Sequence, residues 1–368
     1  MSEPIRQPID ITSLERYLEN NVPDVKIPVE VTQFGFGQSN PTYQLTDRNG
    51  AKYVLRKKPP GKLLSKTAHK VEREYRVIHA LEKTDVPVPE TLCLCEDEEV
   101  IGTPFYIMSF LDGRIYEDPS FPGKFTRWHD AIRTLAKFHC VDPKSVGLQS
   151  YGKSAGFYNR QLATFSKISE SQAEAVDVDT KKAVGKIPHF DDMVSFFSDP
   201  QTQPKDRGTL VHGDYKIDNV VFHKTEPRVI GILDWEMSTI GHPLSDLANL
   251  LTPHLTATSH LATKIQPSGR RHSAFEPGAV PGLPTREQCL RWYREVTGWD
   301  PTGELTWADA FGIFRGSIIM QGIAARYALR QASSAKATDY AIQMRPYAEF
   351  AWGLVEELKD GGRGKAKL

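Results

Sequence analysis

The order of strands and helices along the chain constrains its fold more than any other feature. Alternating apolar residues mark short strands in the first third, at 29–34, 42–45, 53–56, 93–95 and 105–110. After Asp112-Gly113 the apolar period is mostly helical. Strands followed by helices predict an α+β chain of two lobes, a β-rich N-lobe and a mainly helical C-lobe. We place the N-lobe at 1–110, the C-lobe at 111–360 and a flexible tail at 361–368.

Helical spacing places Val71, Tyr75 and Ile78 on one side of a helix at 69–83, within the N-lobe. Further helices are predicted at 124–138, 161–168, 188–197, 244–250, 286–297 and 306–329. Residues 252–284 are rich in Pro, Gly, His and Ser, which predicts a long loop.

Composition restricts the kinds of molecule that the chain is expected to bind and its class of protein. The 368 residues carry 46 basic and 46 acidic side chains, so a basic nucleic-acid binder is not expected. No run of residues is long and apolar enough to span a membrane, and the first residues lack the apolar core of a secretory signal. Four cysteines are too few for a disulfide scaffold, and we expect reduced thiols.

One segment with β character, at 209–235, carries the chemistry. Two apolar residues lead into a polar loop that ends at Asn219, and a hairpin follows with its turn at 224–227. Counting residues about that turn pairs Val220 with Leu233, so Asn219 is expected to face Asp234 at the end of the hairpin.

An amide oxygen beside a carboxylate suits Mg²⁺, which also takes water and the phosphates of a nucleotide. Asp214 is placed to accept a proton from an incoming hydroxyl, and Lys216 to neutralise charge on the transferring phosphoryl group. Together with His212, these residues match the spacing of the catalytic Asp and the metal-binding Asn in protein kinases. The alternative interpretation is that Asp and Asn only cap turns.

Asp246 follows Asp234 by twelve residues. It either caps a helix or, as we favour, braces the catalytic loop with His212 by accepting backbone N–H groups. The interval between Asp234 and Asp246 is too short for a segment that docks a peptide, which favours a small-molecule acceptor.

In the N-lobe, Gly35 and Gly37 lie in a turn that can approach phosphate closely. Strand alternation puts Arg56 on one face, and helical spacing turns Glu74 inward, so the two are expected to pair and to orient nucleotide phosphates. A surface Glu beside a snorkelling Arg is the alternative. Ser109 and Phe110 follow a strand and suit a connector whose backbone binds adenine, or a plain buried strand.

These residues bring the chain close to a known family. It resembles the aminoglycoside phosphotransferase/choline kinase-like small-molecule kinases, and more closely the phosphotransferase domain at the N-terminus of some acyl-CoA dehydrogenase family members. The segments that carry the resemblance are 71–75, 212–219, 232–248, 282–287 and 314–322.

The resemblance implies a protein-kinase-like fold, ATP as donor, Asp214 as catalytic base, and Asn219 and Asp234 as Mg²⁺ ligands. Arg56 stands where the family usually has a phosphate-binding Lys, which bears on nucleotide affinity and donor choice. Hydroxyacyl groups, free or as CoA thioesters, are plausible acceptors in the subgroup. In the late helix, Arg315, Gln321 and Arg326 hold a carboxylate or phosphate of the acceptor, or the arginines pair with acidic residues.

Alternatives to a hydroxyacyl kinase are a kinase for an aminoglycoside- or choline-like acceptor, a nucleotide-binding regulatory module without turnover, and a hydrolase, which lacks a placed nucleophile. The terminal Ala-Lys-Leu resembles the peroxisomal Ser-Lys-Leu signal, which predicts binding to a peroxisomal import receptor and a location in the peroxisomal matrix. If the tripeptide is a chance basic tail, we expect a cytoplasmic protein.

Overall fold

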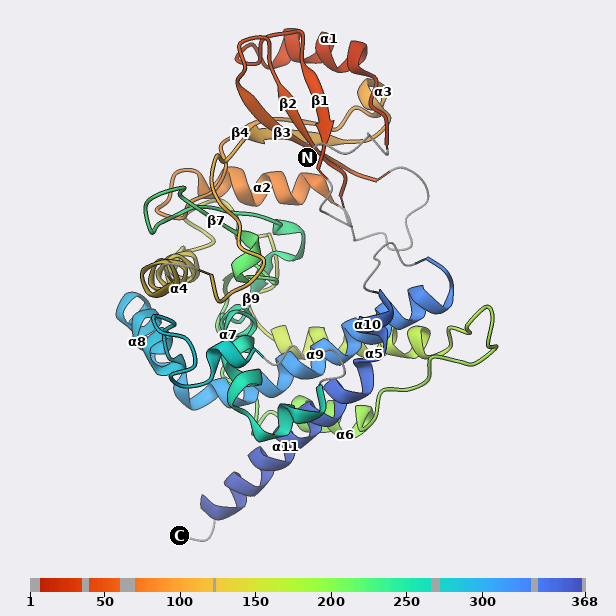
Figure 1. Ribbon diagram of the computed structural model, residues 1–368, viewed down its shortest axis with the longest axis vertical. Helices are drawn as coiled ribbons and strands as arrows, with labels where there is room; N and C mark the ends of the chain where they lie inside the picture. Colours follow the sequence, from red (N-terminus) through yellow and green to blue (C-terminus); the bar gives the residue numbers. More distant parts are fainter. Residues whose placement is uncertain are drawn as a thin grey trace.

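The computed structural model describes residues 7–34, 40–59, 70–121, 124–265, 272–331 and 337–365 and shows two lobes (Figure 1). The first lobe is built on a small antiparallel sheet, and the second is mainly helical. The predicted α+β, protein-kinase-like fold is confirmed. The boundary at residue 110 and the tail at 361–368 stay predictions.

Five strands form the N-lobe sheet in the order β1 (Glu30–Gln33), β2 (Thr42–Thr46), β3 (Lys52–Lys57), β5 (Phe105–Ser109) and β4 (Thr91–Cys95). On one face Leu45 and Leu55 pack with Leu14 and Leu18 of α1 (Ile11–Asn21). On the other face Val54 joins the core that includes α2 (Val71–Leu81). A short helix, α3 (Glu98–Ile101), lies near α1. Arg56 shares the face of Val54, because alternate residues of a strand point the same way.

Helices of the C-lobe surround α9 (Thr302–Ala328) (Figure 1). It contacts α5 (Phe157–Ala173), α7 (Leu244–Thr258), α10 (Ala337–Ala341) and α11 (Met344–Lys365). The apolar core of this lobe is continuous with the α2 side of the N-lobe sheet. The other helices in the described part of the C-lobe are α4 (Lys124–Cys140), α6 (Phe190–Ser198) and α8 (Arg286–Thr297).

Two short strand pairs lie at the junction of the lobes and position the catalytic segment. Strand β6 (Thr209–Val211) pairs with β9 (Thr239–Gly241), and β7 (Val220–Phe222) pairs with β8 (Val229–Ile232). The loop between β6 and β7 and the turn between β8 and β9 therefore lie side by side.

The predicted register of the hairpin is wrong by one residue. Val220 faces Ile232, and not Leu233, while the Leu233 N–H donates to the Asn219 carbonyl (N···O 2.9 Å). His223 pairs with Arg228 across the turn, and regular pairing from there would place Val220 opposite Gly231. A bulge at Ile230 adds one residue to β8 and moves the partner of Val220 to Ile232. Asn219 therefore lies opposite Leu233, and Asp234 is one residue further along, still at the same end of the hairpin as Asn219.

Within the ranges that the structure describes, the sequence patterns missed four helices, α1, α3, α10 and α11. The long loop predicted at 252–284 is partly wrong. Helix α7 continues through Pro253 to Thr258, because buried side chains at Leu250, Leu251 and Leu255 outweigh the helix-breaking tendency of proline. Two 3₁₀ turns follow, at His260–Ile265 and Ser273–Phe275. Among the described residues, no helix has the length and apolar character needed to cross a membrane.

Candidate active site

The loop between β6 and β7 is anchored by a buried carboxylate. Asp246, in the first turn of α7, is fully buried and accepts the backbone N–H of His212 (2.6 Å) and of Gly213 (2.8 Å). It also contacts Nε2 of His139 (3.2 Å). Burial opposes the charge of Asp246, but His139 and these N–H groups outweigh it and hold the pKa of the carboxyl below its ordinary value. The contacts are those of a brace for the loop, and not of a helix cap.

The ring of His212 links the loop to the hairpin. The Asp214 N–H donates to its Nδ1 (3.2 Å), so the ring proton lies on Nε2, which donates to the Leu233 carbonyl (2.8 Å). His212 thereby ties the catalytic loop to Leu233, the residue before Asp234, and this fixes the two chain segments relative to each other.

Two amides hold the carboxylate of Asp214. Asn219 Nδ2 donates to Asp214 Oδ2 (3.2 Å) and to the Asp214 carbonyl (2.9 Å). Asn249, on α7, donates to Asp214 Oδ1 (3.3 Å) and to the Tyr215 carbonyl (3.1 Å). Both oxygens are thus oriented, and about one-third of the side chain stays exposed, so it can be reached by a substrate hydroxyl.

The charges around Asp214 are mixed. Partial burial raises the pKa of its carboxyl, although Lys216 and Arg315 oppose the rise. Lys216 Nζ lies 2.9 Å from Asp218 Oδ2 and 3.8 Å from Asp214 Oδ2. Burial opposes the charge of Lys216, but these two carboxylates outweigh it and raise its pKa, so the amine stays charged. Asp214 therefore has the exposure and setting of a general base, with cations next to it.

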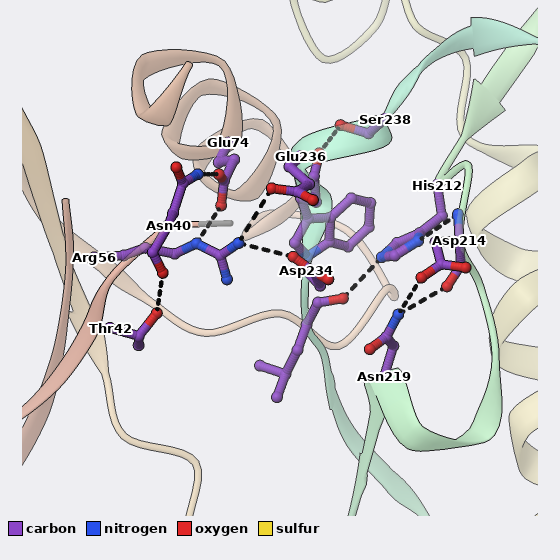
Figure 2. A network of polar contacts seen from close by, with 12 residues as sticks. Asn40, Thr42, Arg56, Glu74, His212, Asp214, Asn219, Asp234, Glu236 and Ser238 are labelled. Carbon is purple, nitrogen blue, oxygen red and sulfur yellow. Dashed lines mark hydrogen bonds and ion pairs between the residues drawn. The ribbon is translucent and has the colours of Figure 1, made fainter. Parts of the chain in front are cut away.

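Arg56 joins the N-lobe to the end of the hairpin. Its Nε lies 2.9 Å from Glu74 Oε2, so the predicted Arg56–Glu74 pair is present. A guanidinium nitrogen of Arg56 also lies 2.8 Å from Asp234 Oδ1 and 3.7 Å from Glu236 Oε2. In Figure 2, Asp234 lies between Arg56 on one side and the Asp214–Asn219 pair on the other.

Glu74 is held in the interior by three donors. Besides Arg56, Asn40 Nδ2 donates to Glu74 Oε1 (2.5 Å) and the Tyr106 hydroxyl donates to Oε2 (3.2 Å) (Figure 2 shows the Asn40 bond). Burial raises the pKa of Glu74 to about 7, against the attraction of Arg56. Glu74 is thus the anchor that aims Arg56 at Asp234, at the end of the hairpin.

The residues predicted as metal ligands fit a hard divalent cation. Because Asn219 donates through Nδ2 toward Asp214, its Oδ1 is left as an acceptor. Asp234 uses Oδ1 for Arg56 and is 37% exposed. In the described part of the chain, no group of three or more His, Cys, Asp or Glu side chains has the geometry of a metal site. One amide and one carboxylate suit Mg²⁺, which keeps water and phosphate ligands.

The other predicted site residues lie in different places. Arg315, on α9, donates to the Gly213 carbonyl (2.8 Å) and so lies at the catalytic loop. Gln321 is fully buried and donates to the Gly185 carbonyl (2.9 Å), which is a structural contact in place of the predicted substrate contact. Arg326 is exposed on the same helix.

Ser109 and Phe110 lie at the end of β5. The Ser109 N–H donates to the Glu90 carbonyl (2.8 Å), and the Lys52 amine lies 5.5 Å from the centre of the Phe110 ring. Their part in nucleotide binding stays a prediction. Gly35, Gly37 and the terminal Ala-Lys-Leu lie outside the described residues.

Comparison with known proteins identifies the family. The model of the phosphotransferase enzyme family matches residues 30–271. The chain belongs to this family. The protein is therefore a small-molecule phosphotransferase that acts on a hydroxyl group, and the geometry of the site agrees with this reaction.

Two curated relatives are acyl-CoA dehydrogenase family members. Member 11 of Gallus gallus is 37% identical over 358 residues, which cover 95% of this chain and 44% of the relative. Member 10 of Mus musculus is 38% identical over 375 residues, covering 98% of this chain and 33% of the relative. The chain thus spans less than half the length of these relatives.

Solved structures show the same fold. A candidate aminoglycoside phosphotransferase from Ralstonia eutropha has a TM-score of 0.77 and 36% identity, covering 95% of this chain and 99% of the other. A spectinomycin phosphotransferase, solved with ADP and spectinomycin, has a TM-score of 0.58 and 14% identity over 95% of this chain and 99% of the other. The second comparison shows the fold alone.

Several contacts of the site were not predicted from sequence. Asn249 follows Asp246 by three residues, which places both on one side of a helix, and this spacing was the available signal. Asn40 follows the predicted glycine turn in the sequence, and Tyr106 faces Arg56 across the β3–β5 pair. His139 had no signal, because it meets Asp246 only through the packing of α4 on the loop.

Proposed function

We propose that the protein transfers the terminal phosphoryl group of ATP, with Mg²⁺, to a hydroxyl of a small hydroxy acid or hydroxyacyl-CoA. The observation that carries this proposal is the Asp214 carboxylate, oriented by Asn219 and Asn249 beside an amide–carboxylate pair suited to Mg²⁺. The use of a nucleotide is supported by fold relatives solved with ADP or ATP.

Each residue has a distinct task in this reaction. One oxygen of Asp214 accepts the proton of the acceptor hydroxyl while the hydroxyl oxygen attacks the γ-phosphorus of ATP, whose bond to the bridging oxygen breaks so that ADP leaves. Lys216 places a positive charge beside the transferring group, and Arg56, held by Glu74, orients the other phosphates. Mg²⁺ bound by Asn219 and Asp234 would supply further neutralisation of phosphate charge.

The charge near the base favours an anionic acceptor. Arg315 and Lys216 both act on the Asp214 carboxyl electrostatically, and Arg315 reaches the backbone of the loop itself. A polycationic antibiotic would meet these cations, whereas a carboxylate or phosphate group would be attracted to them. The names of the relatives, which are acyl-CoA dehydrogenase family members, agree with an acyl acceptor.

A single-turnover assay with ATP and Mg²⁺ tests the proposal. The acceptor panel holds hydroxyacyl-CoAs, free hydroxy acids, choline and an aminoglycoside. Removing a general base costs about 10²–10⁴-fold in rate, so Asp214→Asn should lose most of the product. Asp112→Asn is the matched control, because Asp112 pairs with Lys224 at the opposite end of the hairpin. Equal background from wild type and Asp214→Asn on every acceptor would refute the proposal.

A nucleotide-binding module without turnover is the second candidate. It is favoured by the Arg56–Asp234 contact of 2.8 Å, which engages a predicted metal ligand. Measuring ADP binding with and without Mg²⁺, together with product formation, separates the two functions. Abundant product from any acceptor excludes the module.

The location of the protein stays a proposal. We propose that Ala-Lys-Leu acts as a peroxisomal signal. Residues 361–368 fused to the C-terminus of a fluorescent protein should direct it to peroxisomes, and the same fusion without the final Leu368 should remain cytoplasmic. Identical distributions of the two fusions would contradict the proposal.

A further inference from the structure

Arg73 connects α2 to the segment that follows Asp234. One of its guanidinium nitrogens donates to the Tyr151 carbonyl (3.1 Å) and to the Ser238 carbonyl (3.3 Å). Its guanidinium carbon lies 4.2 Å from the centre of the Tyr151 ring, a cation–π contact. Arg73 is one residue before Glu74, so the helix that anchors Arg56 is joined here to the C-lobe.

The Tyr151 side chain also contacts both α2 and the turn that follows Asp234. Its hydroxyl lies 3.2 Å from the Arg73 carbonyl and 2.6 Å from Ser238 Oγ, and Ser238 Oγ contacts the Trp235 carbonyl (2.5 Å). Tyr151 and Ser238 are both buried. We call Arg73, Tyr151 and Ser238 the interlobe clamp.

The clamp closes the turn that holds Asp234 in a strained conformation. Asp234 has φ 66° and ψ 59°, in the left-handed region that non-glycine residues avoid, and the 3₁₀ turn Trp235–Met237 follows it directly. Such a conformation persists only where surrounding contacts hold it. Ser238 ends this turn, and its N–H donates to the Trp235 carbonyl (3.0 Å).

We propose that Arg73 is a positioning residue which, through Tyr151 and Ser238, holds Asp234 in its metal-binding conformation and in register with Glu74 on α2. The inference deepens the proposed function and rests on its assignment of Asp234 as a metal ligand. The two halves of the phosphate site, Arg56 with Glu74 and Asp234 with Asn219, are thereby fixed to one another before any ligand binds. The clamp lies outside the site and touches no reacting group.

Arg76 offers a matched control on the same helix. It donates to the Gly147 carbonyl (3.2 Å) and to Ser150 Oγ (3.0 Å), so it also joins α2 to the stretch before Tyr151. It is exposed and has no contact with Ser238. Arg76→Gln therefore removes an interlobe contact of similar kind and leaves the turn after Asp234 intact.

Calorimetric titration with ADP, with and without Mg²⁺, tests the inference without an acceptor. Releasing a strained ligand conformation should weaken Mg·ADP binding about tenfold in Arg73→Gln and Tyr151→Phe, because part of the population no longer presents Asp234. Metal-free ADP should bind these variants as it binds wild type, and Arg76→Gln should match wild type in both titrations. Tyr151→Phe keeps the ring, so it decides the question if Arg73→Gln fails to fold.

Amide hydrogen exchange in the absence of nucleotide gives a second readout. Peptides covering 234–241 should exchange faster in Arg73→Gln and Tyr151→Phe than in wild type and Arg76→Gln. If wild type binds no ADP, the proposed function fails, and exchange still tests the clamp. Unchanged exchange with unchanged Mg·ADP affinity in both clamp variants, or equal effects from Arg76→Gln, would overturn the inference.

Discussion

Replacing Asp246 by Asn should loosen the catalytic loop at a predictable cost. The carboxylate accepts from two backbone N–H groups, at 2.6 and 2.8 Å, and contacts His139 at 3.2 Å. An amide keeps one acceptor oxygen and turns an NH₂ group toward one of these donors. The loss of one charge-assisted hydrogen bond and the new donor–donor conflict together cost about 2–4 kcal/mol.

The unfolding entropy of a chain of 368 residues is about 0.8 kcal/mol/K, so that free energy lowers Tm by about 3–5 °C. The two N–H groups belong to the residues just before Asp214, so kcat should also fall by about tenfold or more as the base loses its position. Thermal unfolding and steady-state turnover measure the two effects. Ser245→Ala is the control in the same helical turn, because it removes one hydrogen bond, to the His242 carbonyl (2.9 Å), and leaves the loop untouched.

The effect of Asp246→Asn has a defined pH dependence. The native state holds the pKa of Asp246 below its ordinary value of 3.8, so the ionised form stabilises the fold above that pH. This stabilisation is lost as the pH falls through the lowered pKa. The Tm difference between wild type and Asp246→Asn should therefore be constant near neutral pH and shrink in strong acid. A variant with wild-type Tm and wild-type turnover would refute the brace.

Three further predictions concern the same site. Burial raises the pKa of Glu74 to about 7, so the stability that its neutral form provides is lost as the pH rises through that value, and its ion pair with Arg56 forms. The terminal phosphate of ADP itself loses a proton at about pH 6, so ADP affinity should rise between about pH 6 and about pH 8 in both proteins, and more steeply in wild type than in Glu74→Gln. The raised pKa of Asp214 should place the acidic limb of the kcat–pH profile above the ordinary value of 3.8, and a limb below it would contradict the setting described for the base. Gly213→Ala should abolish most turnover and cost about 1–3 kcal/mol in unfolding free energy, because Gly213 has φ +84° and an added Cβ would lie 2.7 Å from the Met237 carbonyl oxygen; normal activity and stability in this variant would show that the loop can move away from the turn.

Local patterns predicted the parts of the site that depend on periodicity. Strand alternation and helical spacing brought Arg56 and Glu74 together, and the structure shows that pair at 2.9 Å. The predicted hairpin correctly placed Asn219 and Asp234 at one end, because the position of the turn determines which residues lie at the open end. Its register was wrong because the count set Val220 two residues too far along β8, whereas regular pairing from His223 and Arg228 gives Gly231 and the bulge at Ile230 adds one residue, to Ile232.

Contacts between distant segments could not be predicted in the same way. Arg73, Tyr151 and Ser238 are separated by 78 and 87 residues, and each alone resembles an ordinary polar residue of a helix or loop. Such contacts depend on how the lobes pack, which no single segment encodes.

The central claim is that Asn219 and Asp234 bind a divalent cation next to a base that is not itself a metal ligand. Electron paramagnetic resonance of Mn²⁺ titrated with ADP measures this directly. We expect Asn219→Ala and Asp234→Ala to weaken nucleotide-dependent Mn²⁺ binding by at least about tenfold, while Asp214→Ala, which adds no donor beside Asn219, binds Mn²⁺ as wild type does. Wild-type Mn²⁺ binding in Asn219→Ala and Asp234→Ala would contradict the account.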